Sequence, residues 1–586
     1  TKGTVSDYEG KYSIIANSTD ILIFSYLGYK TLEISIGNRK IIDVKMLDTT
    51  TSLQEVTVNA GYYSVKEKER TGSIAKITSK DIEKQPVNNV LATMQGRMAG
   101  VNITQNTGMP GGGFNIEIRG QNSLRLEGSN PLYIIDGVPY SSQDIGSGYT
   151  SGNIPGQNSP LNSINPGDIA NIEVLKDADA TAIYGSRGAN GVVLITTKKG
   201  KEGKTVFSTT YSNGFGQVPH FMSLMNTSQY LSMRREAFAN DGVTTYPPEA
   251  YDVNGTWDQN RNTDWQKELF GGTATFTNVQ STLTGGSAQT QFLISGNYNK
   301  ETTVFTGDFD YIKANGHINL NHESENKKFK INFTAGYTAQ FNTLPSIDFT
   351  RDAITLAPNA PALYDASGNL NWENNTFDNP LAKLQGGIKG ETYDFVSSAL
   401  LSYDLGSGFT AKSSFGYTDL RQEQLNLLPS TIYNPAYGLG SEVSSVFSNK
   451  VNRNSWIIEP QLGWNRTVGK GKIEVLAGST FQQQKGKQLV SVSEGFASNS
   501  LMENPASAAF YLILNSDETV YKYQAFFGRI NLNWQGKYLL NLTGRRDGSS
   551  RFGPGRQFAS FGAIGAAWVF GEENFIKEKI RFFSFG

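Results

Sequence analysis

The chain contains no cysteine, and only three of its 586 residues are histidines. Without cysteine it forms no disulfide and has no thiolate metal site or cysteine nucleophile. The histidines, at positions 220, 317 and 322, do not have the spacing of a zinc site, and no Gly-x-Ser-x-Gly nucleophile elbow stands out. The glycines at 111–113 are not followed by the Lys-Ser/Thr of a phosphate loop. We therefore expect no catalytic residues, no metal and no cofactor.

Long apolar runs are also missing. Hydrophobic residues make up 38% of the chain and the mean hydropathy is −0.38. No stretch of about eighteen apolar residues occurs, which excludes a helical membrane span. A transmembrane β-barrel is compatible with these values, because only every second strand residue faces lipid. The net charge of −1 indicates no nucleic-acid partner.

What the chain has instead is a long series of alternating segments. In residues 311–321 one face carries Ile312, Ala314, Gly316, Ile318 and Leu320, and the other carries Lys313, Asn315, His317, Asn319 and Asn321. A period of two places the two sets on opposite sides of a sheet, and residues 329–338 repeat the pattern. An apolar face opposite Asn, Thr and Lys is what a barrel needs when lipid lies outside and water inside. The pattern predicts an outer-membrane protein.

The predicted strands are joined by alternately short and long connections. We expect strands at 204–216, 274–285, 289–299, 309–321, 329–339, 389–403, 408–420, 453–467, 472–484, 519–534, 537–546, 557–570 and from 579 onward. The long connections are expected at 217–273, 340–388, 421–452 and 485–518. Short periplasmic turns and long outer loops are typical of bacterial barrels.

By this count the last strand is about the thirteenth. Single-chain bacterial barrels have even strand numbers and must close, because an open edge in lipid leaves backbone groups unpaired. We therefore expect further strands of the barrel to follow residue 586. The sequence also begins within a strand-like segment, which indicates a processing or truncation edge.

Three regions precede or form the barrel. Residues 1–47 are predicted to be a small, incomplete β-sandwich with strands at 11–15, 21–26, 31–36 and 41–46. Residues 48–70 are predicted to be a linker. Residues 71–203 are predicted to be a mixed α/β unit with helices opening at Ser79 and spanning 88–98, and strands at 114–119, 132–136, 172–176 and 192–197. This unit is polar and compact enough to sit inside a pore. The barrel region is then 204–586.

Several long sequence motifs in these regions resemble those of one protein family. Residues 130–140 read Asn-Pro-Leu-Tyr-Ile-Ile-Asp-Gly-Val-Pro-Tyr, and residues 116–123 and 172–200 carry equally long patterns. They resemble the plug signatures of the SusC family of TonB-dependent outer-membrane transporters, the SusC/RagA type. Residues 263–270 and 545–553 resemble SusC barrel words, and residues 3–14 with 24–29 resemble the carboxypeptidase-regulatory-like module that precedes many SusC plugs. The resemblance covers essentially the whole chain.

The resemblance implies a fold and a mechanism. The fold is mainly β: a transmembrane antiparallel barrel, of about 22 strands in the whole family, with an α/β plug and an N-terminal carboxypeptidase-regulatory-like β-sandwich. Such proteins sit in the bacterial outer membrane and import nutrients, most often oligosaccharides, beneath a SusD-like lipoprotein. TonB, energised by the inner-membrane proton gradient, pulls a short strand and remodels the plug. No substrate bond is broken, so the resemblance implies that the protein is not an enzyme.

The resemblance also assigns site residues. The strip that matches the TonB box is Leu53, Gln54, Glu55, Val56, Thr57, Val58 and Asn59. The plug words contribute Arg119, Gly120, Asp136, Gly137, Pro139, Tyr184, Gly185, Arg187 and Gly188. Glycine and proline in these words are also what tight turns need, and we favour that interpretation over direct substrate contact. Arg119, Arg125 and Arg187 either pair with carboxylates of the barrel wall and hold the plug, or lie exposed.

Trp257, Trp265 and Trp372 fall in the predicted outer loops. Their rings could stack on sugars, although packing within the loops is the more common role of such residues. Import of an oligopeptide or a siderophore by the same architecture remains open. A passive porin or adhesin, or a barrel enzyme such as a lipid hydrolase, is a further alternative that the plug and the strip argue against.

Overall fold

The computed structural model describes residues 3–7, 10–26, 29, 31–46, 57–59, 61–66, 69–85, 87–124, 126–141, 143, 145–151, 159–573 and 575–576. The chain divides into two units, residues 1–58 with 64–68 and residues 59–63 with 69–586, which are described separately.

The first unit contains short strand pairs. Strands β1 (Ile21–Phe24) and β2 (Leu32–Ser35) pair antiparallel, and β3 (Thr57–Asn59) pairs with β4 (Ser64–Lys66). The predicted strands at 11–15 and 41–46 are wrong, because neither segment forms a ladder although both lie within the described residues. A hydrogen bond from the Tyr12 hydroxyl to the Ile42 carbonyl (2.8 Å) links the two segments instead.

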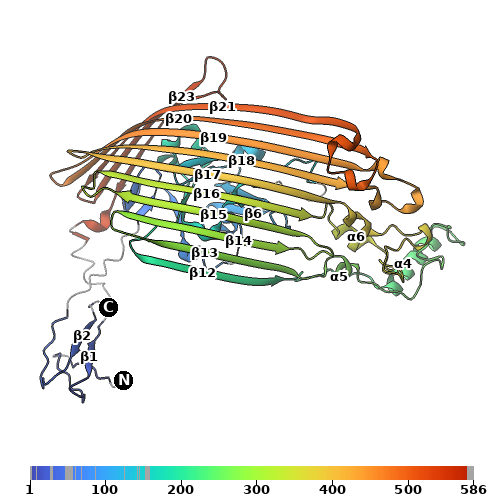
Figure 1. Cartoon of the computed structure of the whole chain (residues 1–586), viewed down its shortest axis with the longest axis horizontal. Coiled ribbons are helices and arrows are strands. Elements are labelled where there is room, and N and C mark those ends of the chain that lie inside the picture. Colours follow the sequence, from blue (N-terminus) through green and yellow to red (C-terminus); the bar gives the residue numbers. More distant parts are fainter. Residues whose placement is uncertain are drawn as a thin grey trace. The chain divides into compact units, whose positions relative to one another are not determined.

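The second unit is dominated by one antiparallel sheet, which we call the strand wall. Each strand pairs with the next in chain order (Figure 1). The strands are β12 (Gly203–Gly216), β13 (Ala274–Gly286), β14 (Thr290–Thr302), β15 (Asp310–Glu323), β16 (Phe329–Leu344), β17 (Gly387–Gly406), β18 (Phe409–Leu428), β19 (Ser445–Val468), β20 (Gly471–Phe496), β21 (Ala508–Trp534), β22 (Tyr538–Ser549) and β23 (Phe558–Trp568). The predicted mainly β fold class is confirmed, with twelve of the expected strands; the one expected from residue 579 lies outside the described residues.

Two long connections are shorter than predicted. The loop expected at 421–452 spans only 429–444, and the loop expected at 485–518 spans 497–507. The strands continue into these segments because β20 and β21 stay paired as far as Phe496 and Ala508. On β21 the added segment begins with residues 508–514, which are apolar on both faces, so it lacks the alternation that marks a strand.

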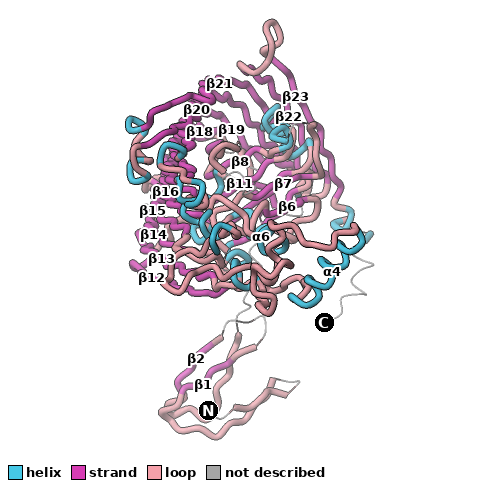
Figure 2. The backbone as a smooth tube through the Cα atoms, turned by 90° about the vertical axis from the view of Figure 1, so that its right-hand side faces the viewer, coloured by secondary structure: helices cyan, strands magenta, loops and turns pink. Residues whose placement is uncertain are grey.

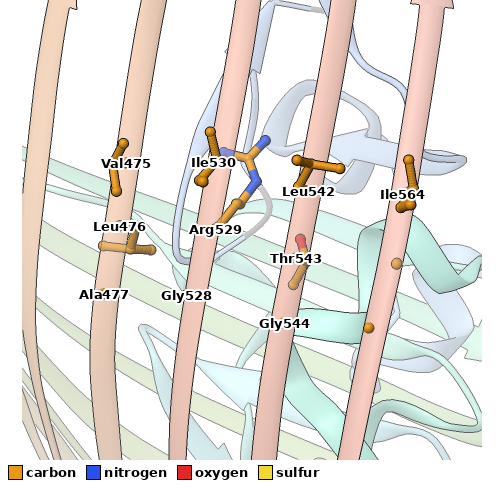
Figure 3. Close-up of a pocket in the computed structure, with 12 residues that line it drawn as sticks. Val475, Leu476, Ala477, Gly528, Arg529, Ile530, Leu542, Thr543, Gly544 and Ile564 are labelled. Carbon is orange, nitrogen blue, oxygen red and sulfur yellow. The ribbon is translucent and has the colours of Figure 1, made fainter.

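Side-chain orientation along the wall is the reverse of a soluble sheet. On β15, Lys313, His317 and Asn319 are buried, whereas Ile318 and Leu320 are 38% and 37% exposed on the opposite face. Figure 3 shows the exposed face of β20–β23, where Val475, Ile530, Leu542 and Ile564 form one row across four strands. The next row is Ala477, Gly528, Gly544 and Gly562, and these small residues leave a shallow groove of about 660 Å³. The outer face is therefore the one suited to lipid.

The α/β unit lies against the concave face of the wall (Figure 2). Its five-stranded sheet has the order β5-β10-β11-β8-β9, with only β8 and β11 parallel. The strands are β5 (Ile74–Thr78), β8 (Leu132–Ile135), β9 (Val138–Tyr140), β10 (Ile169–Leu175) and β11 (Val192–Thr197); β6 (Val101–Gln105) pairs with β7 (Phe114–Ile118). Helices α1 (Ser79–Ile82), α2 (Val90–Met94) and α3 (Ala178–Thr181) are short. Val90, Leu91, Ile169 and Ile172 are at most 1% exposed and form the centre of its core.

The helix predicted at 88–98 is shorter than expected. The Asn89 side chain caps α2 by accepting from the Leu91 amide (2.7 Å). The helix ends at Met94 because Gln95 has an extended ψ of 127° and Gly96 a φ of +70°, which glycine adopts without strain.

The two longest loops fold onto each other. They contain α4 (Thr227–Asn240), α5 (Trp265–Phe270) and α6 (Thr350–Thr355), of which α5 and α6 are in contact (Figure 1). In the part of the chain that the structure describes, no helix combines the length and the apolar character needed to cross a membrane.

Candidate functional site: the contact between the α/β unit and the strand wall

The inward-facing polar residues of the wall bind the α/β unit through many neutral donors. The 3₁₀ turn η4 (Pro166–Asp168) ends in Asp168, which is 5% exposed. Its carboxylate accepts from Gln280 (2.9 Å), Ser295 (2.6 Å) and Asn315 (2.9 Å), on three neighbouring strands. Buried polar groups need hydrogen-bond partners, and these three side chains supply them. Asp168 therefore fixes the α/β unit to β13–β15.

Lys313 makes a second contact on this flank. Its side chain is almost fully buried, and the ammonium donates to the carbonyls of Asn88 (2.7 Å) and Asn162 (3.1 Å). Further along the wall, Thr338 donates to the Ser163 carbonyl (2.8 Å). Backbone carbonyls of the α/β unit thus serve as acceptors for wall side chains.

The other flank of the wall carries buried charges. Arg545 and Asp547, both on β22, form an ion pair of 2.6 Å, and their side chains are 0% exposed. Asp547 also accepts from the Ser186 amide (2.8 Å) and hydroxyl (3.0 Å), and Arg545 donates to the Ile183 carbonyl. This four-residue set, which we call the β22 anchor, holds the 3₁₀ segment η5 (Ala182–Gly188).

Gly185, a predicted plug residue, occupies the sharp bend of η5. Its φ of 62° and ψ of −141° are accessible to glycine but strained for other residues, and a Cβ there would collide with the Asp547 carboxylate. Gly188 is similarly close to Thr181 and Tyr184. The backbone conformation thus explains Gly185, and lack of space for a Cβ explains Gly188.

The other plug words also form turns. Asp136 and Gly137, with φ of 46° and 87°, connect β8 to β9, and the Asp136 carboxylate accepts from the Thr197 amide (2.9 Å) and hydroxyl (2.7 Å). Arg119 and Gly120, with φ of 60° and 88°, follow β7, and Arg119 is exposed. Pro139 lies buried in β9.

Arg187 lies against the wall. Its Nη1 donates to Gln482 on β20 (2.6 Å), and its guanidinium lies 4.3 Å from the centre of the Tyr523 ring. No ion pair forms at Arg187 within the described residues, so its partners there are an amide and an aromatic face. Arg119 is exposed and does not reach the wall, and Arg125 lies outside the described residues. Arg187 reaches the wall, where it bonds to the Gln482 amide and not to a carboxylate.

Tyr62 and Tyr63 attach the segment that follows the predicted TonB box. The Tyr62 hydroxyl donates to buried Glu459 on β19 (2.8 Å), and its ring lies 5.1 Å from that of Tyr184. Burial, and then the Glu459 carboxylate, raise the pKa of the Tyr62 phenol, which therefore stays protonated as the donor. The Tyr63 ring lies 3.4 Å beneath the guanidinium of Arg529.

The predicted TonB box is only partly visible. Leu53–Val56 lie outside the described residues, whereas Thr57–Asn59 form β3, paired with β4. Three residues separate this strip from Tyr63 and its contact with the wall. No pattern in the sequence indicates Glu459 as the partner of Tyr62.

The predicted tryptophans differ in exposure. Trp265 is 3% exposed, packs with Phe349 and Phe377, and donates to the Ala357 carbonyl (2.8 Å). Trp257 packs against the same cluster, with its indole donating to Thr376 (3.0 Å), and Trp372 is half-buried. The Trp265 ring has no free face for a sugar in this conformation. Within the described residues, no group of three or more His, Asp or Glu side chains is arranged to hold a metal ion.

Replacing Tyr62 with phenylalanine is expected to weaken this attachment. The change leaves the buried Glu459 carboxylate with one fewer donor, a loss of about 1.5–3 kcal/mol for a hydrogen bond to a charged group. Hydrogen–deuterium exchange of residues 59–70 in the intact protein should become faster. Tyr211→Phe, at an exposed position on β12, is the matched control. Equal exchange in both variants would show that the phenol does not hold this segment.

Comparison with known proteins gives family matches for the two regions that precede the strand wall. Residues 66–192 match the TonB-dependent Receptor Plug Domain, and residues 1–58 match the CarboxypepD_reg-like domain. The TonB-dependent receptor P26 of Formosa agariphila is 32% identical over 602 residues, covering 99% of this chain and 57% of that protein. The TonB-dependent receptor SusC of Bacteroides thetaiotaomicron is 28% identical over 614 residues, again covering 99% and 57%. The chain thus spans a little more than half the length of these relatives.

Among solved structures, the RagAB peptide importer in its "open-open" state has a TM-score of 0.73 and 22% sequence identity. The match covers 89% of this chain and 59% of that one. At this identity the likeness concerns the fold alone.

Proposed function

The chain belongs to the SusC-like TonB-dependent receptors, as its motifs predict, and from this premise we propose that it takes part in active import of a nutrient oligosaccharide across the bacterial outer membrane. In this proposal the strand wall is part of the membrane barrel and the α/β unit is its plug. TonB supplies the pull from the periplasm, and a SusD-like lipoprotein covers the outer face.

The observation that carries the proposal is the connection between the plug and the strip that matches the TonB box, which we call the docking strip. Two residues separate the strip Leu53–Asn59 from Tyr62, which contacts both Glu459 in the wall and Tyr184 in the plug. A strand-addition partner binds mainly backbone groups, so TonB can hold the strip whatever its side chains. A pull on the strip then acts first on the Tyr62 and Tyr63 contacts and next on the residues around Tyr184.

The orientation of the wall supports the proposed membrane location. Aliphatic side chains such as Ile318 and Ile564 face outward, and the inward face is filled by polar contacts with the plug. Lipid-exposed apolar residues alternating with polar interior residues are typical of outer-membrane barrels.

Interrupting the strip tests the proposal. Val58→Pro removes a backbone N–H and fixes φ, so it should block strand addition, whereas Val58→Ile keeps the backbone groups. In cells whose growth on an oligosaccharide depends on the intact receptor, the proline variant should grow no better than a strain lacking TonB. The isoleucine variant should grow normally. Unchanged uptake in the proline variant would favour a passive channel.

A further inference from the structure

A cavity of about 680 Å³ lies between the plug and the inner face of β18–β21. Its wall side includes Thr418, Ser455, Gln484 and Tyr521, which are directly paired across the four strands. Its plug side includes the ends of β8 and β9 and the residues around Ser186. The volume is within the range of roughly 300–1,000 Å³ that small-molecule sites occupy.

The charge of this cavity is of one sign. Arg187 from the plug, Arg453 from β19 and Arg551 from the β22–β23 turn line it, and none of the described lining residues is Asp or Glu. Three guanidinium groups around one cavity without a lining carboxylate create a positive potential, which concentrates anions.

The arginines are held in place by neutral groups. The Arg551 guanidinium lies 4.3 Å from the centre of the Tyr521 ring, and Arg453 Nη1 donates to the Ser141 hydroxyl (2.6 Å) and the Gln143 carbonyl (2.9 Å). Arg187 bonds to Gln482, and its buried Nε has no hydrogen-bond partner among the described residues. Within that part of the chain, neither Arg187 nor Arg551 forms an ion pair. Positioned guanidinium groups of this kind bind carboxylate and sulfate oxygens well.

The rest of the lining suits a hydroxyl-rich ligand. Amide side chains, including those of Asn130 and Gln484, can both donate and accept, as sugar hydroxyls do. Tyr140 and Tyr521 add aromatic surface, and the apolar side chains are few. A purely apolar or cationic ligand would leave these groups unpaired at a cost.

We propose that this cavity binds an acidic oligosaccharide, with its carboxylate or sulfate groups at Arg551 and Arg187 and its hydroxyls at the surrounding amides. The inference rests on the proposed import function and narrows its substrate class.

Arg187 lies between this ligand site and the contacts of Tyr62, which lies just after the docking strip. A smaller cavity of about 180 Å³ on the other side of Arg187 is lined by Tyr62 and Glu459, and Arg187 and Pro139 line both cavities. An anion bound at Arg187 therefore lies next to the contact on which TonB would pull first.

Binding of defined probes to the intact, detergent-solubilised receptor tests the inference. Isothermal titration calorimetry would compare trigalacturonate, a sulfated chondroitin disaccharide, neutral maltotriose and triglutamate. Trigalacturonate binding indicates carboxylate recognition, and binding of the chondroitin disaccharide alone indicates a requirement for sulfate. Maltotriose should bind at least about tenfold more weakly than the better acidic sugar, because a charged hydrogen bond contributes about tenfold to a hundredfold in affinity. Triglutamate should also bind at least about tenfold more weakly, because it lacks the hydroxyls that pair with the amide side chains.

Arg551→Gln should reduce affinity for the acidic sugar by about tenfold to a hundredfold. Arg551→Lys should restore part of it, and binding to the unchanged receptor should weaken with added salt. Arg466→Gln, at an exposed position near the short-turn end of β19, is the matched control and should bind normally. Equal binding of maltotriose, or no effect of Arg551→Gln in a folded receptor, would overturn the inference.

Triglutamate binding without sugar binding would replace the oligosaccharide by an acidic peptide and would equally overturn it. TonB-dependent growth on a neutral sugar, combined with no binding of either acidic sugar, would refute this inference and leave the import function standing. Unchanged uptake in the Val58→Pro variant, with acidic sugars still bound by the receptor, would refute the TonB-dependent import function and leave the acidic-sugar site standing.

Discussion

Replacing Asp547 with alanine should destabilise the contact between the plug and the wall by about 3–5 kcal/mol, the usual result of removing one partner of a buried ion pair. The change leaves the Arg545 guanidinium, which is 0% exposed, without its carboxylate. It also removes the acceptor for the Ser186 amide and hydroxyl. One substitution thus leaves both a buried charge and two donors of η5 unsatisfied.

Hydrogen–deuterium exchange of residues 182–188 in the intact receptor would measure this loss, alongside urea unfolding. The control is Asp419→Ala, which removes the partner of Arg421 in an ion pair whose arginine is 67% exposed. Exposed pairs contribute about 0–1 kcal/mol, so the control should change little. Similar small effects at both positions would mean that the β22 anchor does not hold the plug.

Gly185→Ala should be destabilising by about 3 kcal/mol or more, because it combines backbone strain with displacement of a buried group. The φ of 62° and ψ of −141° are unfavourable for alanine. The added Cβ would also meet the Asp547 carboxylate, which cannot move without breaking its bonds to Ser186 and Arg545.

Gly544→Ala is the matched substitution, since Gly544 lies on the same strand as the anchor and a Cβ there meets no atom within 4 Å. Thermal unfolding of the two purified variants should show a clear loss for Gly185→Ala and almost none for Gly544→Ala. A Gly185 variant as stable as the unchanged receptor would contradict the conformational role assigned to this bend.

The strand wall was predictable because its pattern is local. Alternation such as that of Lys313, Asn315 and His317 against Ile312, Ala314 and Ile318 needs no knowledge of the rest of the chain, and the strands lie close to their expected positions. Prediction failed at the outer end of β21, where residues 510–514 are apolar on both faces and strand pairing continues without alternation. It also failed at 11–15 and 41–46, where alternation occurs without a ladder.

The contacts of the site were predictable only in part. Glycines such as Gly185 and Gly137 stand out because turn geometry restricts the residue at one position. The partners of Tyr62 and Ser186 lie 397 and 361 residues away along the chain, so no local pattern relates them. Asp168 and Lys313 look in sequence like any other polar strand or turn residue. The import roles of the docking strip and the plug residues stay predictions.

The unequal strand lengths have a consequence for the rim of the receptor. β12 and β14 contain 14 and 13 residues, whereas β21 contains 27. At about 3.3 Å per residue and a tilt of about 45°, the short strands rise roughly 30 Å, the thickness of a hydrocarbon core, and β21 roughly 60 Å. In a bilayer, the long-loop ends of β18–β21 would extend beyond the hydrocarbon core, whereas the short strands would not. Under the proposed import function, a sugar arriving from outside would meet these strand ends before it reached Arg551 and Arg187 in the cavity.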